Sequence, residues 1–223
     1  MKCGGDVKIK NAKETKVELT PFVAKHYNAI LNIFSFGIYP HFTTKVVKEA
    51  NFRKGDSVLD LGSGTGRFAC LIRKYIGEEG KYVGVDFSRI MVQQARKRCE
   101  GFKNIRFLSG RIEKELSLTE YFDKVFISFV LHGFTQENRI KLIRNTYKQL
   151  RTGGEFIILD YAERDVDRAS PIVKFLIRKV ECPLAEKFMQ INLKEVLFKI
   201  GFSAFREKFH LKGYVRLEMC KKR

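Results

Sequence analysis

Apolar and polar positions alternate between two patterns over the middle of the chain. The apolar runs that predict buried strands lie at 58–61, 82–85, 105–108, 124–129 and 155–160. The stretches with apolar residues at helical spacing lie between them, near 65–76, 89–99 and 136–150. Strands that alternate with helices are typical of an α/β fold, in which helices cover both faces of a mostly parallel sheet.

The N-terminal part follows another pattern. Residues 1–18 are polar, lysine-rich and without periodicity, which predicts a mobile basic tail. Thr20-Pro21 opens an amphipathic helix, the stretch 37–40 ends it, and a second helix is expected at 43–50. We interpret residues 19–52 as a helical lid. A helix pair packed on the core would bury the same residues and is the alternative.

After the fifth predicted strand the spacing changes again. Ser170-Pro171 opens an apolar helix that carries basic residues, and a further helix ends at Gly201. We expect a helical cap insertion at about 166–190, followed by two strands at 204–209 and 214–220 that form a hairpin. The main domain then extends over residues 53–223.

A glycine-rich motif marks the candidate site. The run Val58 to Gly66 reads VLDLGSGTG, and a second apolar run ends in a carboxylate at Asp86. This order predicts a strand, a glycine loop, a helix and a strand with an acidic tip. Glycines let the backbone approach a ligand, the helix start offers free N–H groups, and Asp86 can hold a ribose diol. The motif therefore predicts a nucleoside-cofactor site.

Two nucleoside cofactors fit this motif. Gly64-Thr-Gly66 through Ala69 also satisfies the dinucleotide fingerprint, so the pattern alone does not exclude NAD. Asp60 separates the two, because a carboxylate at the end of the first strand repels a pyrophosphate. The same carboxylate attracts the ammonium and sulfonium groups of S-adenosylmethionine. Charge therefore favours the methyl donor.

With Val58–Gly66 and Asp86 in place, the chain resembles the class I S-adenosylmethionine-dependent methyltransferases. The resemblance covers about residues 53–220. It implies a Rossmann-like sheet of seven strands, mostly parallel, with helices on both faces and a C-terminal antiparallel hairpin. It also implies S-adenosylmethionine as cofactor, no metal, and Asp86 as the ribose-binding acid.

Ligands of such sheets bind outside the carboxyl ends of the strands. Arg111 stands where the family usually has an acid that touches adenine, and we assign it no base-reading role. Either backbone near Ile112 meets the adenine amino group, or adenine binds more weakly here. The residues predicted to line the cofactor are Tyr27, Asp60, Gly62, Ser63, Gly64, Thr65, Gly66, Asp86, Phe87, Met91, Arg111, Ile112 and Ser128.

The segment after the fourth strand should lie under the methyl group. It reads FISFVLH from Phe126 to His132 and lacks the Asn/Asp-Pro-Pro-aromatic motif that nucleic-acid amino-methyltransferases commonly carry. His132 is the candidate general base for a phenol, a hydroxyl or a ring carbon. A hydrogen-bonded loop histidine is the alternative. Asp160-Tyr161, at the end of the fifth strand, either shapes the pocket or forms a plain turn.

Within the superfamily, the stretch from Tyr27 to Gly37 resembles the N-terminal signature of the ubiquinone/menaquinone-biosynthesis C-methyltransferases, with Ser35 also in step. The end of the chain, from Gly201 to Lys221, is similar to that family too. The resemblance implies a quinol precursor or another small, lipid-like acceptor. A phospholipid amine and RNA are the alternative acceptors.

Charge and cysteine content limit the classes of binding partner and the expected compartment. Lys and Arg number 43 against 25 Asp and Glu, which gives a net charge of +18. Such a surplus attracts an anionic membrane surface, nucleic acid or a charged substrate, or it belongs to a solvated lysine-rich surface without a partner. Without the amine-binding motif, nucleic acid is the weaker expectation. The 5 cysteines show no metal-site or disulfide-framework spacing, and the start lacks an apolar signal segment, so we expect a cytoplasmic protein, peripheral to the membrane at most.

Overall fold

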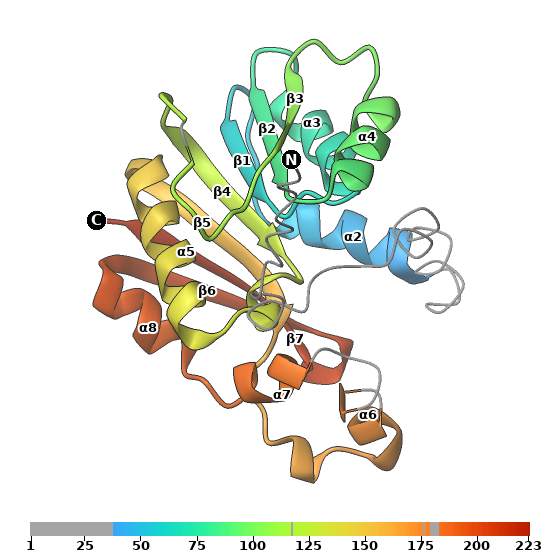
Figure 1. Ribbon diagram of the computed structural model, residues 1–223, viewed down its shortest axis with the longest axis vertical. Coiled ribbons are helices and arrows are strands. Elements are labelled where there is room, and N and C mark those ends of the chain that lie inside the picture. The colour runs from blue at the N-terminus through green and yellow to red at the C-terminus, as the bar shows by residue number, and fades with distance from the viewer. Residues whose placement is uncertain (1–37, 117, 176, 179–182) are drawn as a thin grey trace, which may run out of the picture.

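The computed structural model describes residues 38–223 except 117, 176 and 179–182. Its centre is a 7-stranded sheet with strand order β3-β2-β1-β4-β5-β7-β6 (Figure 1). The strands are β1 (Ser57–Leu61), β2 (Lys81–Asp86), β3 (Ile105–Ser109), β4 (Phe122–Ser128), β5 (Leu150–Tyr161), β6 (Phe202–His210) and β7 (Val215–Lys222). The first five pair in parallel, whereas β7 runs antiparallel to both β5 and β6. The predicted sheet and its closing hairpin are confirmed.

Helices cover both faces of the sheet (Figure 1). One apolar cluster joins α2, α3 and α4 to the sheet, and a second joins α5 and α8 to the opposite face. Two short helices, α6 and α7, lie at the lower end of the view, and α7 contacts the turn that follows β4. The bounds are α2 (Ile38–Glu49), α3 (Arg67–Ile76), α4 (Arg89–Arg98), α5 (Gln136–Gln149), α6 (Pro171–Phe175), α7 (Pro183–Phe188) and α8 (Leu193–Ile200).

Local signals in the sequence account for several helix ends. The Ser88 hydroxyl accepts from the Met91 N–H at the start of α4, and the Thr135 hydroxyl accepts from the Asn138 N–H at the start of α5. Gly201, with φ 120°, ends α8. A side-chain oxygen at the cap satisfies a backbone donor that the first turn leaves without a partner. These two caps and this helix end were predicted, and they are confirmed.

The second helix starts earlier than predicted. It includes Ile38 rather than starting at residue 43, so residues 38–40 are helical where a helix break was predicted. Pro40 lies in its first turn, where a missing N–H costs nothing because that donor has no partner inside the helix. Phe42, Val46 and Val47 are buried in the core cluster with α3 and α4. The helix predicted from Thr20-Pro21 lies outside the described residues.

The fifth strand also starts earlier than predicted, at Leu150, which pairs with Phe122. Gly153 has φ 76°, a conformation that L side chains rarely adopt, and it allows the chain to continue from Leu150 into the buried part of β5. In the described part of the chain, every helix is too short or too polar to cross a bilayer.

Candidate functional site

The glycine loop lies between β1 and α3. Gly62, Gly64 and Gly66 all have positive φ, at 79°, 52° and 72°. A Cβ at Gly62 would lie 2.6 Å from Val130 Cγ2, so this position admits only glycine. A Cβ at Gly64 would meet nothing within 4 Å, because this part of the loop faces open space. The loop is therefore packed from behind at one glycine and open to a ligand at another.

Asp86 holds the loop in place from the neighbouring strand. Its Oδ2 accepts from the Gly64 N–H at 2.9 Å, and its Oδ1 accepts from the Ser88 N–H at 2.9 Å. Burial raises the pKa of Asp86, and these two hydrogen bonds oppose the rise. Each carboxylate oxygen keeps a second lone pair, so the side chain can still accept from a ribose diol while it orders the loop.

Asp60 lies behind the loop and is 1% exposed. The Tyr82 hydroxyl donates to its Oδ2, while Oδ1 has no hydrogen-bond partner among the described residues. Burial raises the pKa of Asp60 to about 7, and the nearby Asp86 carboxylate adds to the rise. From the sequence, Asp60 was expected to carry a full negative charge. In the fold, burial favours the protonated form of Asp60 more than it would be favoured in water, and a bound cation would favour the ionised form.

The unpartnered oxygen atoms of this site fit S-adenosylmethionine. An unsatisfied carboxylate oxygen is costly in a protein interior, and an ammonium donor compensates that cost. Ser63 Oγ is likewise buried without a partner among the described residues. These two oxygen atoms can accept hydrogen bonds from a cationic nucleoside that enters at the open face of Gly64. A pyrophosphate has no comparable match, because it adds negative charge beside Asp60.

The other predicted cofactor residues have different positions. Phe87 follows Asp86 and is 37% exposed, whereas Met91 is buried in α4. Ser128 ends β4, half-buried beside Leu159 of β5. Thr65 is buried beside Gly66 at the end of the loop.

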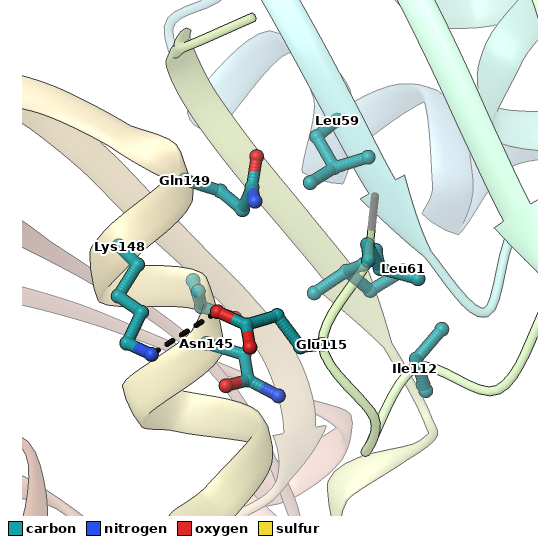
Figure 2. A pocket seen from close by; sticks show the side chains of 9 residues that line it. Leu59, Leu61, Ile112, Glu115, Asn145, Lys148 and Gln149 are labelled. Atoms are coloured by element: carbon teal, nitrogen blue, oxygen red, sulfur yellow. Dashed lines mark hydrogen bonds and ion pairs between the residues drawn. The ribbon is translucent and has the colours of Figure 1, made fainter. Parts of the chain in front are cut away.

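The segment after β3 carries Arg111 and Ile112, two of the residues predicted to line the cofactor. Arg111 is half-exposed and forms an ion pair with Glu113. Ile112 belongs to the apolar cluster under α5, where Figure 2 shows it near Leu61 at the edge of a small gap. The Lys148–Glu115 ion pair, at 3.2 Å, lies at the outer side of this gap. The Ile112 side chain packs in the apolar cluster, and a contact between adenine and the backbone near Ile112 stays a prediction. Tyr27 lies outside the described residues.

The turn after β4 brings His132 to the end of β5. His132 Nδ1 lies 2.8 Å from Asp160 Oδ1, and the His132 N–H donates to Asp160 Oδ2 at 3.3 Å. Asp160 is 2% exposed, and the Tyr161 N–H also donates to it. Ser128 pairs with Leu159, so the two parallel strands end side by side. The sequence had singled out both segments, but it did not predict that His132 and Asp160 form a pair.

Aromatic rings surround this pair. The rings of His132 and Tyr161 lie 5.0 Å apart, and Tyr161 meets Phe129 edge-on at 6.0 Å. Phe42 of α2 lies 6.5 Å from Phe129. Phe129 has φ 52°, an unusual conformation for a bulky residue, and such residues cluster at functional sites. The carboxyl ends of β4 and β5 thus present an aromatic surface next to a histidine–carboxylate pair.

A family model described as a methyltransferase domain matches residues 52–196. The chain belongs to this methyltransferase family, which confirms the class that the glycine motif predicted.

Its relatives include two bacterial proteins named ubiquinone/menaquinone biosynthesis C-methyltransferase UbiE. The protein from Haemophilus ducreyi is 29% identical over 171 residues, which is 74% of this chain and 65% of that protein. The protein from Coxiella burnetii is 29% identical over 144 residues, which is 63% of this chain and 57% of that protein. The chain thus spans less than two thirds of the length of either relative.

Solved structures share the fold. A SAM-dependent methyltransferase from Aquifex aeolicus aligns with a TM-score of 0.62 at 22% identity, covering 80% of this chain and 89% of its own. Human N-acetylserotonin methyltransferase, solved in complex with SAM, aligns with a TM-score of 0.64 at 19% identity, covering 89% of this chain and 55% of its own. These likenesses confirm the Rossmann-like methyltransferase fold.

Proposed function

We propose that this chain transfers a methyl group from S-adenosylmethionine to a small aromatic acceptor, a quinol precursor or a similar lipophilic ring. The observation that carries the proposal is the His132–Asp160 pair at the carboxyl ends of β4 and β5, at 2.8 Å. The names of the UbiE relatives support the quinol acceptor. The chain lacks the amine-binding motif of nucleic-acid methyltransferases after β4, which favours a ring carbon or hydroxyl over a base amine.

The cofactor supplies an electrophilic methyl group, so alignment and exclusion of water are the main tasks of the protein. In this proposal the backbone of the glycine loop and the Asp86 carboxylate hold the nucleoside. Asp60 receives the ammonium group through its unsatisfied Oδ1. With the cofactor held by these residues, its methyl group would face the segment that ends at His132.

His132 then acts as the base. Asp160 accepts from Nδ1–H, which selects the tautomer whose basic lone pair is on Nε2. Nε2 would take the hydroxyl proton of the acceptor, while the cofactor would supply the methyl group and leave as S-adenosylhomocysteine. Loss of that proton raises the electron density of the ring and prepares a carbon or an oxygen for attack. The aromatic faces of Tyr161 and Phe129 suit a planar acceptor.

A methyl-transfer assay tests this function. The chain is incubated with labelled S-adenosylmethionine and, in parallel, with a lipid extract that contains quinols, with phospholipids and with total RNA. We expect label in the quinol fraction. Label in the RNA alone would contradict the proposal, and label in phospholipid alone would reassign the acceptor to a lipid amine.

The pH dependence of cofactor binding tests the role of Asp60. Its pKa is raised to about 7, and an ammonium group binds the ionised form. Affinity should therefore rise with pH, and S-adenosylmethionine should bind about tenfold more tightly at pH 8 than at pH 6. Calorimetry on the Asp60→Asn variant is the control, because titration of the ligand itself remains in both proteins. A wild-type profile that matches the variant would remove Asp60 from the cofactor site.

We also propose that the protein binds an anionic membrane surface, because the proposed acceptor is lipophilic and the net charge is +18. Phe209 and Leu211 are 58% and 55% exposed, and Lys208 and Lys212 flank them. This turn precedes β7, whose first residue pairs with Tyr161. The exposed apolar side chains therefore lie at the edge of the sheet that carries the His132–Asp160 pair.

Vesicle sedimentation tests this surface. We expect salt-sensitive binding to vesicles of anionic phospholipid, and the double change Phe209→Ser with Leu211→Ser should weaken it about tenfold or more through lost apolar burial. Phe198→Ser is the matched control, because Phe198 is 55% exposed on α8. Absence of wild-type binding at low salt, or an equal loss in the Phe198 variant, would contradict this surface.

A further inference from the structure

Two cysteines lie behind the glycine loop, 29 positions apart in the sequence. Cys70 is in α3, and Cys99 caps the C-terminal end of α4. Their Sγ atoms are 2.9 Å apart, closer than non-bonded sulfur atoms ordinarily approach. Cys99 Sγ also lies 3.9 Å from the carbonyl oxygen of Gly66. The pair therefore connects the helix that follows the glycine loop with the helix that follows Asp86.

The two thiols differ in environment. Cys70 is half-buried, whereas Cys99 is 5% exposed. The hydrogen bond from Cys99 lowers the pKa of Cys70 to about 7, and the nearby Arg98 and Lys74 charges contribute. The pKa of Cys99 is raised, first by its hydrogen bond to Cys70 and then by burial. Cys70 is thus the more exposed of the two thiols and the one whose thiolate is favoured, and the thiol form is favoured for Cys99 beside it.

We propose that Cys70 and Cys99 form a reversible intramolecular disulfide when the protein meets a peroxide. The Cys70 thiolate attacks one peroxide oxygen, the O–O bond breaks, and hydroxide leaves and takes a proton, so that Cys70 becomes a sulfenic acid. The Cys99 sulfur attacks the Cys70 sulfur, the S–O bond breaks, and water leaves with the Cys99 proton. Two thiols lose two electrons, hydrogen peroxide becomes two waters, and a dithiol reductant reverses the change.

The disulfide would restrain the cofactor loop from behind. A Cβ at Gly66 would lie 3.0 Å from the Cβ of Ala95, so α4 is already packed closely against the end of the loop. A covalent link between α3 and α4 closes a loop of about 30 residues in the unfolded chain, which lowers the entropy of that state. The oxidised protein should therefore melt at a temperature roughly 5–10 °C higher than the reduced protein.

The experiment treats the reduced, full chain with hydrogen peroxide, alkylates the remaining thiols and maps the peptides without reduction. We expect one cross-linked peptide pair that joins Cys70 to Cys99, with the loss of two hydrogen atoms. Cys220→Ser is the matched control and should keep the link, because Cys220 is buried with its thiol on the Phe156 carbonyl. Cys70→Ser and Cys99→Ser should lose it, and Cys99→Ser should accumulate a sulfenic acid that dimedone traps at Cys70.

Two measurements on the wild type do not depend on whether the variants fold. Iodoacetamide should alkylate Cys70 faster than Cys220 in the native protein, and the rise in melting temperature should disappear after dithiothreitol. The proposal would be overturned if, after peroxide treatment of the folded protein and subsequent unfolding, both Cys70 and Cys99 were still alkylated. A link from Cys70 to any other cysteine, or a cross-linked pair without a rise in melting temperature, would overturn it as well.

Discussion

Replacement of His132 by glutamine is expected to lower turnover on the true acceptor by about 100-fold or more, because general-base help is typically 10²–10⁴-fold. Affinity for S-adenosylmethionine should remain nearly unchanged, since His132 lies at the methyl end of the proposed site. Glutamine can still form a hydrogen bond to Asp160, so the turn after β4 is retained. Single-turnover methyl transfer and calorimetry measure the two effects separately.

The contact between His132 and Asp160 allows a second test of the base. Asp160→Asn should also lower turnover, because the amide no longer selects the tautomer that leaves Nε2 basic. The double variant should lose little more than either single variant, since the two residues act as a unit. The wild-type rate should fall as the pH is lowered and the imidazole becomes protonated, and this dependence should disappear in His132→Gln.

The control for this series is His41→Gln, because His41 is exposed on α2. It should retain wild-type turnover. Near-normal turnover in His132→Gln would make His132 a structural residue of the turn, and the mechanism would then depend on alignment alone. An equal loss of turnover in the His41 variant would indicate a structural effect of the substitution rather than the loss of a general base.

The parts of this molecule that follow from local pattern were predicted from the sequence. The strands, the glycine loop and the caps at Ser88 and Thr135 each depend on residues a few positions apart, and the structure confirms them. The start of α2 was predicted too late because Gly37 to Pro40 has the composition of a helix break. Proline in the first turn is compatible with a helix, and packing of Phe42 against the core stabilises that turn.

The features that local pattern did not predict are contacts between distant segments. His132 and Asp160 are 28 positions apart, and Cys70 and Cys99 are 29 apart. One signal was present for the first pair, because both residues lie at the carboxyl ends of neighbouring parallel strands, which meet at one edge of the sheet. The raised pKa of Asp60 depends on burial, which its motif does not report. Residue type indicated the candidate groups, and only the fold showed which of them are partners.

Loss of the Asp86 carboxylate should have the second large effect. Asp86→Ala is expected to weaken binding of S-adenosylmethionine and S-adenosylhomocysteine by about 1.5–3 kcal/mol, which corresponds to roughly 10- to 150-fold. The carboxylate is proposed to accept from the ribose diol, and it also orders the loop through the Gly64 and Ser88 N–H groups. Both contributions favour the bound state.

A matched control separates cofactor binding from general stability. Asp123 also accepts from a backbone N–H, that of Ser57 at 2.8 Å, but at the amino end of β1, where the strand begins. Asp123→Ala should therefore destabilise the fold to a similar degree and leave affinity for S-adenosylhomocysteine unchanged. Calorimetry and thermal melting on both variants measure the two effects. Equal affinities for the Asp86 variant and the wild type, or binding of NAD in place of S-adenosylmethionine, would contradict the assignment of this loop. The comparison thus tests whether Asp86 binds the nucleoside or only supports the turn beside it.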